Sequence, residues 1–513
     1  MNYSFFLKHI ISISFCFMLS SCSNTKENTL PNPEIKVGIA KVSGKITNFS
    51  PSGKEDHPKL ILIVLQPVNA TVIPFYQTTN TVNEDGIFSF EVPMQCSYAV
   101  GYIYSEKNYD KGFNVCLTSG KETKMEIIDE KIDRFKITNQ TDSLGLTSTD
   151  LINMNMVIRM LIHYRTPGIT GCKTSNEFVQ RAKIRLNNKL KKIAENEALS
   201  ETAKNYLANS VKMFTLNWEL FCYRELMQIA YLNDGNEDLE NFNLQEPDKK
   251  YYAFLKDFNL NNPQYLYDEN YPRLLQRILS NAMLNIPVIG DTPIDQWMKE
   301  VKKILSKLVG FKKGLFYDML AANSYTQQFE NELRPLSDKQ IENIHHYFKG
   351  EKEDIAKILI GKNNEIIPLA VQKDPLVVNE TPAVSKEKLM DAIISKYKEK
   401  VVVVDFWATW CGPCLAAMAE YRTVKSELKR KDVIFVYLTN RSSPQKLWKE
   451  KIKGISGEHY YLKDDEWEYL MESFRFEGIP SYVIFDKKGE ARHKFTAYPG
   501  NEKMQAMIEE LLK

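Results

Sequence analysis

The sequence predicts a multidomain protein with an N-terminal β-sandwich, a middle α-helical domain and a C-terminal α/β domain. The chain has 513 residues, which is too long for one typical hydrophobic core. Residues 35–135 contain short apolar segments separated by turn-forming stretches, whereas residues 147–362 show helical spacing. Residues 370–513 contain the segment "VVVVDFWATWCGPC", in which the pattern of a buried strand precedes two closely spaced cysteines.

The first 21 residues predict a signal peptide. Lys8 precedes the apolar run "IISISFCFML", which is too short to span a bilayer. The run ends in Leu19-Ser20-Ser21-Cys22, which resembles the lipobox of bacterial lipoproteins and implies a lipid on Cys22. We expect residues 22–34 to be a polar tether, and the chain to be anchored in the cell envelope facing the periplasm. The alternative is an ordinary cleaved signal that ends near a cysteine.

The segment 35–135 predicts the β-sandwich. In "GIFSFEV" the apolar Phe88, Phe90 and Val92 alternate with polar residues, which is the period of a half-buried strand. Five or more such strands favour a small sandwich. The arrangement resembles the N-terminal β-domains of thioredoxin-like lipoproteins of Bacteroidota.

Residues 147–362 predict an α-helical domain. Ser200 and Ser337 stand where helix N-caps are expected. No catalytic constellation is evident in this region, although its surface is suited to binding a partner. Residues 363–384 predict an extended connector and the first strands of the C-terminal domain.

Cys411 and Cys414 occupy the turn between a central strand and a helix. The "KVVVV" run predicts a strand covered on both faces, and "WCGPCLAAMAEY" predicts a turn into a helix. A helix N-terminus offers unpaired N–H groups and the positive end of the helix dipole, which stabilise a thiolate. The pattern therefore favours thiol chemistry at this pair.

Two motifs in this region resemble a known family. The segment "DFWATWCGPC" is similar to the active site of thioredoxins, in the TlpA- and ResA-like branch of exported proteins, and the resemblance covers about residues 370–513. The segment "FEGIPSYVIFDKKGE" resembles the part of that family in which the bond Ile479-Pro480 is cis and faces the cysteines. The predicted order β-α-β-α-β-β-α is that of the thioredoxin fold.

The resemblance implies a role for each matching residue. Cys411 is expected to be the exposed attacking thiolate, and Cys414 resolves the mixed disulfide, which leaves a redox-active Cys411–Cys414 disulfide. Asp405 matches the buried acid that moves a proton to or from Cys414; its alternative is a core aspartate satisfied by local hydrogen bonds. Pro480 shapes the substrate groove, and Trp407 covers the site. The other residues expected at the groove are Trp410, Gly412, Pro413 and Ile479.

The chain departs from the family in two places. Many TlpA-like members have an acidic residue and a proline in the helix after the motif, where this chain has Ala417 and Ala419. A kink in that helix is therefore not assured. The last strand reads "KFTAYPG" where the family often has a glycine near the groove.

Other kinds of site fit the pattern less well. A zinc site usually needs four ligands, and neither a second Cys-x-x-Cys nor a suitable histidine pair accompanies the motif, so we expect no metal and no cofactor. A structural disulfide at the motif is an alternative to redox chemistry. The formal net charge of +2 gives no electrostatic case for nucleic-acid binding. Cys96 and Cys116 either pair or remain buried thiols, and the pairing of Cys172 and Cys222 is open.

The sequence thus predicts an exported, membrane-anchored oxidoreductase that reduces disulfides of protein substrates. The Gly-Pro dipeptide between the cysteines resembles reducing thioredoxins, at about −270 mV, more than strongly oxidising exported proteins, at about −120 mV. A reductase outside the cytosol needs an electron donor, and a membrane thiol relay would supply it. The alternatives are a disulfide isomerase or oxidase, and a binding lipoprotein whose thioredoxin-like domain is accessory.

Overall fold

The structure is a computed structural model that describes most of the chain. The described residues are 30–47, 58–68, 75–106, 108–129, 135–140, 144–161, 172, 174–233, 242, 244, 247–332, 334–371, 376–428 and 432–513. The predicted signal peptide, Cys22 and most of the tether lie outside these residues. Among the helices that are described, none is long and apolar enough to cross a membrane.

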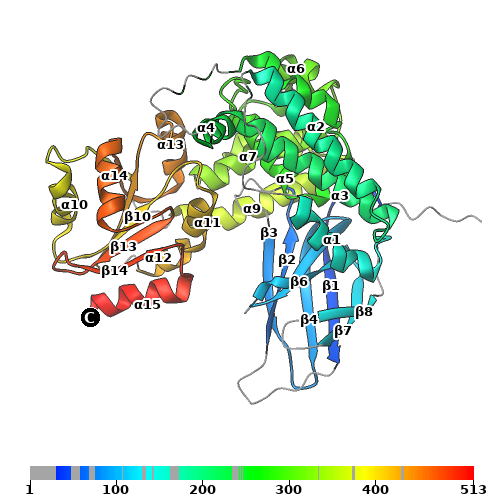
Figure 1. Ribbon diagram of the computed structural model, residues 1–513, viewed down its shortest axis with the longest axis horizontal. Helices are drawn as coiled ribbons and strands as arrows, with labels where there is room; N and C mark the ends of the chain where they lie inside the picture. Colours follow the sequence, from blue (N-terminus) through cyan, green and yellow to red (C-terminus); the bar gives the residue numbers. More distant parts are fainter. Residues whose placement is uncertain are drawn as a thin grey trace, which may run out of the picture.

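The N-terminal region consists of two four-stranded sheets (Figure 1). Burial alternates along the strand that contains Phe88, Phe90 and Val92, as the sequence predicts. Strands continue to Gln140, beyond the predicted end at 135. The first sheet has the order β4-β1-β7-β8, with β1 (Ile35–Thr47), β4 (Ile87–Cys96), β7 (Glu122–Asp129) and β8 (Phe135–Gln140). The second has the order β3-β2-β5-β6, with β2 (Lys59–Leu65), β3 (Phe75–Thr81), β5 (Tyr98–Ser105) and β6 (Asn108–Thr118).

The middle region is helical. Ser200 and Ser337 are N-caps, and Ser337 forms a capping box with Gln340. The α-helices are α1 (Ser148–Leu161), α2 (Ser175–Ala194), α3 (Glu201–Phe214), α4 (Tyr223–Asn233), α5 (Asn270–Ser280), α6 (Ile294–Val309), α7 (Leu315–Glu332), α8 (Asp338–Tyr347) and α9 (Glu353–Val371). Shorter helical segments are η1 (Thr215–Glu219), η2 (Leu220–Cys222), η3 (Lys249–Phe258), η4 (Pro263–Tyr267) and η5 (Gly350–Lys352).

The predicted boundary after residue 362 is wrong, because α9 continues to Val371. Residues 363–371 are therefore helical and not part of an extended connector. Buried Ile355, Leu359 and Ile366 continue the helical spacing across the predicted boundary. Pro368 lies inside this helix, three residues before its end at Val371.

The sheets and the helices share one contiguous apolar core. It includes Val42 and Phe88 from the strands and Phe178 and Leu320 from the helices. Polar contacts also join them: the Asn114 side chain of β6 donates to the Leu151 carbonyl of α1 at 3.1 Å. The N-terminal sheets and the middle helices therefore pack against each other around one hydrophobic core.

The C-terminal region is an α/β domain with a six-stranded sheet in the order β14-β13-β10-β11-β12-β9. The central strand is buried along its whole length, as its valines predict. The sequence did not predict β12, which lies between two expected helices. The strands are β9 (Leu376–Asn379), β10 (Val401–Phe406), β11 (Val433–Thr439), β12 (Gly457–Tyr461), β13 (Ser481–Phe485) and β14 (Ala491–Thr496).

Helices cover both faces of this sheet, each over its own apolar cluster. The contact with the rest of the chain includes α7, which packs against α13 and η7. Figure 1 shows the C-terminal domain beside the helical region, with α10 on the far side from it and α15 along the lower edge of the domain. The helices are α10 (Lys386–Ile394), η6 (Ser395–Tyr397), α11 (Gly412–Glu420), α12 (Arg422–Leu428), α13 (Gln445–Lys451), η7 (Ile452–Gly454), α14 (Asp464–Ser473) and α15 (Asn501–Leu512).

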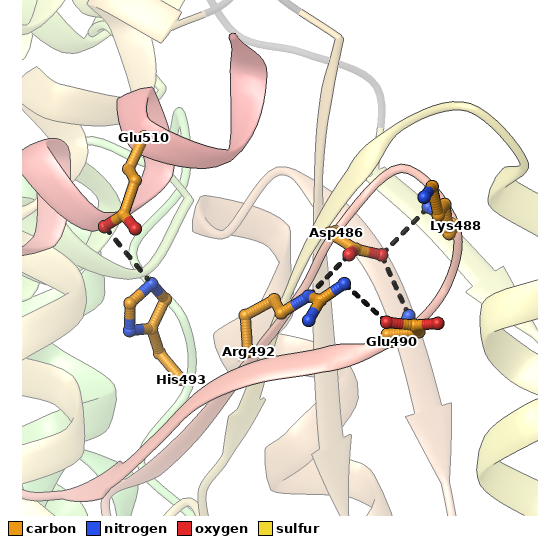
Figure 2. A network of polar contacts seen from close by, with 6 residues as sticks. All are labelled: Asp486, Lys488, Glu490, Arg492, His493 and Glu510. Atoms are coloured by element: carbon orange, nitrogen blue, oxygen red, sulfur yellow. Dashed lines mark hydrogen bonds and ion pairs between the residues drawn. The ribbon is translucent and has the colours of Figure 1, made fainter.

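The hairpin between β13 and β14 is closed by Asp486 (Figure 2). Its carboxylate accepts two backbone N–H groups of the turn, at 2.9 and 3.0 Å, and Nε of Arg492 at 2.6 Å. His493 on β14 lies 3.8 Å from Glu510 on α15. These contacts fix the antiparallel edge of the sheet, and β13 of this hairpin directly follows Pro480.

Candidate active site

The cysteine pair lies where β10 leads into α11. Cys411 is the N-cap of α11, and its sulfur accepts the backbone N–H of Cys414 at 3.1 Å. The two residues form a disulfide, with their Cα atoms 5.3 Å apart. Pro413 stands in the first turn, where its missing N–H costs nothing. The sulfur of Cys411 therefore meets the N–H groups and dipole that favour a thiolate.

Cys411 is not exposed in this disulfide form, contrary to the prediction. Only 3% of its surface is accessible, because its sulfur is bonded to Cys414 and lies against the first turn of α11. Cys414 is fully buried. The adjacent Trp410 is 62% exposed, and its indole N–H donates to Ser442 at 3.2 Å. Trp407, in contrast, is buried in the core.

The second sequence motif packs near the cysteine pair. The Ile479–Pro480 peptide is cis, as the resemblance implies. Ile479 packs against the apolar cluster that holds both cysteines. Ala497, in the "KFTAYPG" segment, adopts a left-handed backbone with φ of 68° and donates its N–H to the Pro480 carbonyl at 2.9 Å. Alanine thus takes a conformation that glycine adopts more readily.

Asp405 sits in a row of side chains that crosses four strands on the cysteine-bearing face. The register pairs Asp405 with Tyr482 of β13 and with Tyr437 of β11. Tyr437 is paired in turn with His459 of β12. Because paired residues in a sheet point to the same face, all four side chains line up, and all are buried.

The Asp405 carboxyl has only part of its hydrogen bonding satisfied. Oδ2 accepts the hydroxyl of Tyr421 at 2.8 Å, whereas Oδ1 has no hydrogen-bond partner among the described residues. Burial raises the pKa of Asp405 to about 7, while the Tyr421 hydrogen bond and the charge of Lys425 oppose this rise. The alternative of an aspartate satisfied by local bonds therefore fits only one of its two oxygens.

Several residues around Asp405 were missed by sequence reasoning. Tyr421 separates α11 from α12, so the helix changes direction there without a proline. Tyr437, Tyr482 and His459 meet Asp405 through the strand register, which single-strand patterns do not reveal. The available signal was weak: Tyr482 follows Pro480 by two positions, and Tyr437 alternates with Phe435 along one strand.

The remaining cysteines do not contribute to the site. Cys96, Cys116, Cys172 and Cys222 are buried thiols, and Cys96 and Cys116 do not form a disulfide with each other. Within the described part of the chain, no group of three or more His, Cys, Asp or Glu residues is placed to hold a metal ion.

The buried Asp405 predicts a specific pH dependence of stability. The folded protein holds this proton more tightly than the unfolded chain, because the pKa rises from 3.8 to about 7. Protonated Asp405 therefore makes its full contribution to the free energy of unfolding below about pH 4. This contribution is lost as pH rises to about 7, by at most roughly 4 kcal/mol. In urea unfolding, the variant Asp405→Asn should gain stability relative to wild type between about pH 4 and about pH 7. A difference between Asp405→Asn and wild type that does not change with pH would contradict the raised pKa.

Comparison with known proteins places this site in a family. The Redoxin family model matches residues 377–512. The thiol-disulfide oxidoreductase ResA of Geobacillus kaustophilus is 25% identical over 118 residues, which is 23% of this chain and 67% of ResA. The thiol-disulfide oxidoreductase YkuV of Bacillus subtilis is 26% identical over 118 residues, which is 22% of this chain and 78% of YkuV.

Among solved structures, one match is the thioredoxin domain of a thiol-disulfide oxidoreductase from Bacteroides vulgatus. It is 20% identical, with a TM-score of 0.21, and the match covers 23% of this chain and 84% of that domain. The residues that match the Redoxin model, 377–512, form the C-terminal quarter of the chain, where the cysteine pair lies. The C-terminal region is therefore a Redoxin domain similar to the TlpA/ResA-like thiol-disulfide oxidoreductases, and through it the chain is an oxidoreductase.

Proposed function

We propose that this chain is an exported, lipid-anchored reductase of protein disulfides. The observation that carries the proposal is the position of Cys411, which caps α11 and is bonded to Cys414 on the face of the sheet that also holds Asp405. A purely structural disulfide requires neither the helix N-terminus nor a half-satisfied acid beside it. Relatives named as thiol-disulfide oxidoreductases support the same chemistry.

The reaction begins with the reduced pair. The Cys411 thiolate attacks one sulfur of the substrate disulfide, which forms a mixed disulfide and releases the other substrate sulfur as a thiolate. Cys414 then gives its proton to the Asp405 carboxylate and attacks the Cys411 sulfur. The bond to the substrate breaks, and the second substrate sulfur leaves with the electron pair. The substrate gains two electrons, and Cys411 and Cys414 end as the disulfide seen in the structure.

This mechanism predicts different outcomes for the two cysteines. Cys411→Ser should lower insulin reduction in the presence of dithiothreitol at least about 100-fold, since it removes the nucleophile. Cys414→Ala should retain the attack but not the resolution, and should accumulate mixed disulfides that separate on non-reducing gels. Cys222→Ser, which changes a buried thiol far along the chain, is the matched control. Equal activity of wild type and Cys411→Ser would refute the enzyme proposal.

The reductive direction has its own test. Gly412-Pro413 resembles the dipeptide of reducing relatives, whereas thiolate stabilisation at the helix N-terminus stabilises the reduced form and by itself raises the reduction potential. We expect a reduction potential near −270 mV in equilibrium with dithiothreitol or glutathione mixtures. A value at about −180 mV or higher would favour the isomerase or oxidase alternative. Outside the cytosol the reductase would draw electrons from a membrane thiol relay.

The membrane anchor is proposed from the sequence alone, since Cys22 lies outside the described residues. When the protein is expressed in a bacterium supplied with labelled palmitate, wild type should incorporate the label and fractionate with membranes. Cys22→Ser should do neither. Cys16→Ser, within the same signal segment, should behave as wild type because that residue is removed with the signal. Labelling of the Cys22→Ser protein would rule out this anchor.

A second role, binding of a partner or ligand, belongs to the N-terminal part of the chain. We propose that its two sheets form a β-sandwich, since strands of both contribute to the same core. A cavity of about 550 Å³ lies between the second sheet and the helices. It is lined by aromatic and polar side chains, among them Tyr102, Asn114, Tyr206, Tyr267 and Asp268. This cavity keeps a binding role open alongside catalysis.

A further inference from the structure

Asp405 has no direct contact with solvent. It is 1% exposed and lies in the centre of the sheet, between Tyr437 and Tyr482 in the neighbouring strands. An acid that exchanges protons with Cys414 must nevertheless recover its protonation state after each cycle. A buried acid does this through a chain of hydrogen-bonded groups that reaches the surface.

Such a chain leads away from Asp405 through two tyrosines and a lysine. The Tyr421 hydroxyl donates to Asp405 Oδ2 at 2.8 Å, and the hydroxyl oxygens of Tyr421 and Tyr437 are 3.3 Å apart. Lys425 Nζ donates to the Tyr437 hydroxyl at 3.1 Å. A hydroxyl has one proton, so Tyr437 supplies the second bond while Tyr421 donates to an ionised Asp405. In this arrangement Lys425 donates to Tyr437, Tyr437 donates to Tyr421, and Tyr421 donates to Asp405.

Lys425 forms the outer end of this chain. Its side chain is only half-buried, unlike those of Asp405, Tyr421 and Tyr437. The ammonium also bonds to the Ser456 carbonyl and lies over the rings of Phe435 and Tyr437, at 4.9 and 5.0 Å. These contacts hold Nζ beside the Tyr437 hydroxyl while part of the side chain stays within reach of water.

We propose that Lys425, Tyr437 and Tyr421 form a proton path that supplies Asp405 when the Cys411–Cys414 disulfide is reduced. The proposal rests on the proposed thiol–disulfide function. A dithiol donor attacks the Cys411 sulfur, the disulfide breaks, and Cys414 leaves as a thiolate that takes the proton of Asp405. The resulting carboxylate takes the proton of Tyr421.

The rest of the path then resets. Tyr421 takes the proton of Tyr437, and Tyr437 takes one from the Lys425 ammonium, whose amine is reprotonated by water. One proton thereby moves from solvent to Cys414, and the electron pair comes from the dithiol. Tyr421 and Tyr437 touch no reacting sulfur atom in this scheme; they relay the proton and position Asp405.

Other titratable groups face Asp405 but do not complete a path. Burial lowers the pKa of His459 to about 3, and its Nε2–H donates to the Ile455 carbonyl at 2.8 Å, so the ring stays neutral. The Tyr482 hydroxyl has no hydrogen-bond partner within the described structure. Tyr498 and Glu420 lie nearby, and the Tyr498 ring contacts that of Tyr421 at 5.4 Å. None of these residues has a hydrogen bond to Asp405 among the described contacts.

The path affects the rate of disulfide cleavage only where Asp405 starts without its proton. Below about pH 7 Asp405 is mostly protonated, because burial raises its pKa. It can then give its own proton to the Cys414 thiolate once without the path. Above about pH 7 the proton must arrive through the tyrosines as the disulfide breaks. The contribution of the path therefore grows with pH.

The decisive variant is Tyr437→Phe, which interrupts the path without removing the bond from Tyr421 to Asp405. The oxidised full-length protein is reduced with dithiothreitol, and the rate is followed by tryptophan fluorescence at each pH. The rate of each variant is divided by the wild-type rate, which cancels the titration of the reductant. We expect a ratio near one at about pH 5 and a decrease of about tenfold at about pH 9. Tyr421→Phe should show at least the same loss at high pH.

The opposite face of the sheet offers a matched control. There Tyr397 donates to Glu458 at 3.0 Å and meets the Tyr460 hydroxyl at 3.0 Å, and Lys396 donates to Tyr460 at 3.2 Å. This cluster has the same groups but belongs to the other apolar layer, which holds no cysteine. Tyr397→Phe should keep a ratio near one at every pH.

Two results would overturn the proton path. A ratio near one at all pH values for Tyr437→Phe would show that the Tyr437 hydroxyl does not relay a proton to Asp405. A loss that is the same at about pH 5 and about pH 9 would assign it a structural role only. Both results are distinct from failure of the proposed function, which appears instead as equal insulin reduction by wild type and Cys411→Ser.

Discussion

The burial of one carboxyl group in the central strand is the constraint on which the rest of the site depends. Asp405 occupies a position of β10 where both neighbouring strands contribute tyrosines, and only one of its oxygens has a partner among the described residues. Burying an ionised carboxylate costs several kcal/mol unless it is fully paired. The domain compensates this cost only in part, through Tyr421 and Lys425, and burial raises the pKa of Asp405 to about 7.

The path of the helix after the cysteines follows from the same constraint. Tyr421 has φ of −84° and ψ of 8°, so the chain turns between α11 and α12 although hydrogen bonds continue on both sides. Its N–H bonds to Ala417, and its carbonyl accepts from Lys425, each at 2.9 Å. The turn directs the phenol down to Asp405. A proline is therefore not required for the bend, because a buried hydrogen bond at its apex stabilises it.

Local patterns were enough to predict the chemistry but not its surroundings. The valine run, the Cys-x-x-Cys turn and the Ile479-Pro480 motif each depend on a few adjacent residues, and the structure has the corresponding strand, N-cap and cis bond. The row through Tyr437 and His459 depends on how separate strands align, and β12 was not predicted at all. The end of α9 was misplaced because residues 363–384 were predicted to be an extended connector, whereas tertiary packing of buried Ile366 extends the helix to Val371.

The two faces of the C-terminal sheet show that residue type alone does not make the site. Tyrosine, lysine and carboxylate groups are hydrogen-bonded on both faces, around Asp405 on one and Glu458 on the other. Glu458 lies at an outer strand and is half-buried, whereas Asp405 lies near the end of the central strand, just before the cysteine turn. β12 leads into α14, whose N-cap is Lys463, whereas β10 leads into α11, whose N-cap is Cys411 and whose N-terminus can stabilise a thiolate. The proton exchange proposed between Asp405 and Cys414 depends on the position of the acid relative to that turn rather than on the composition of its cluster.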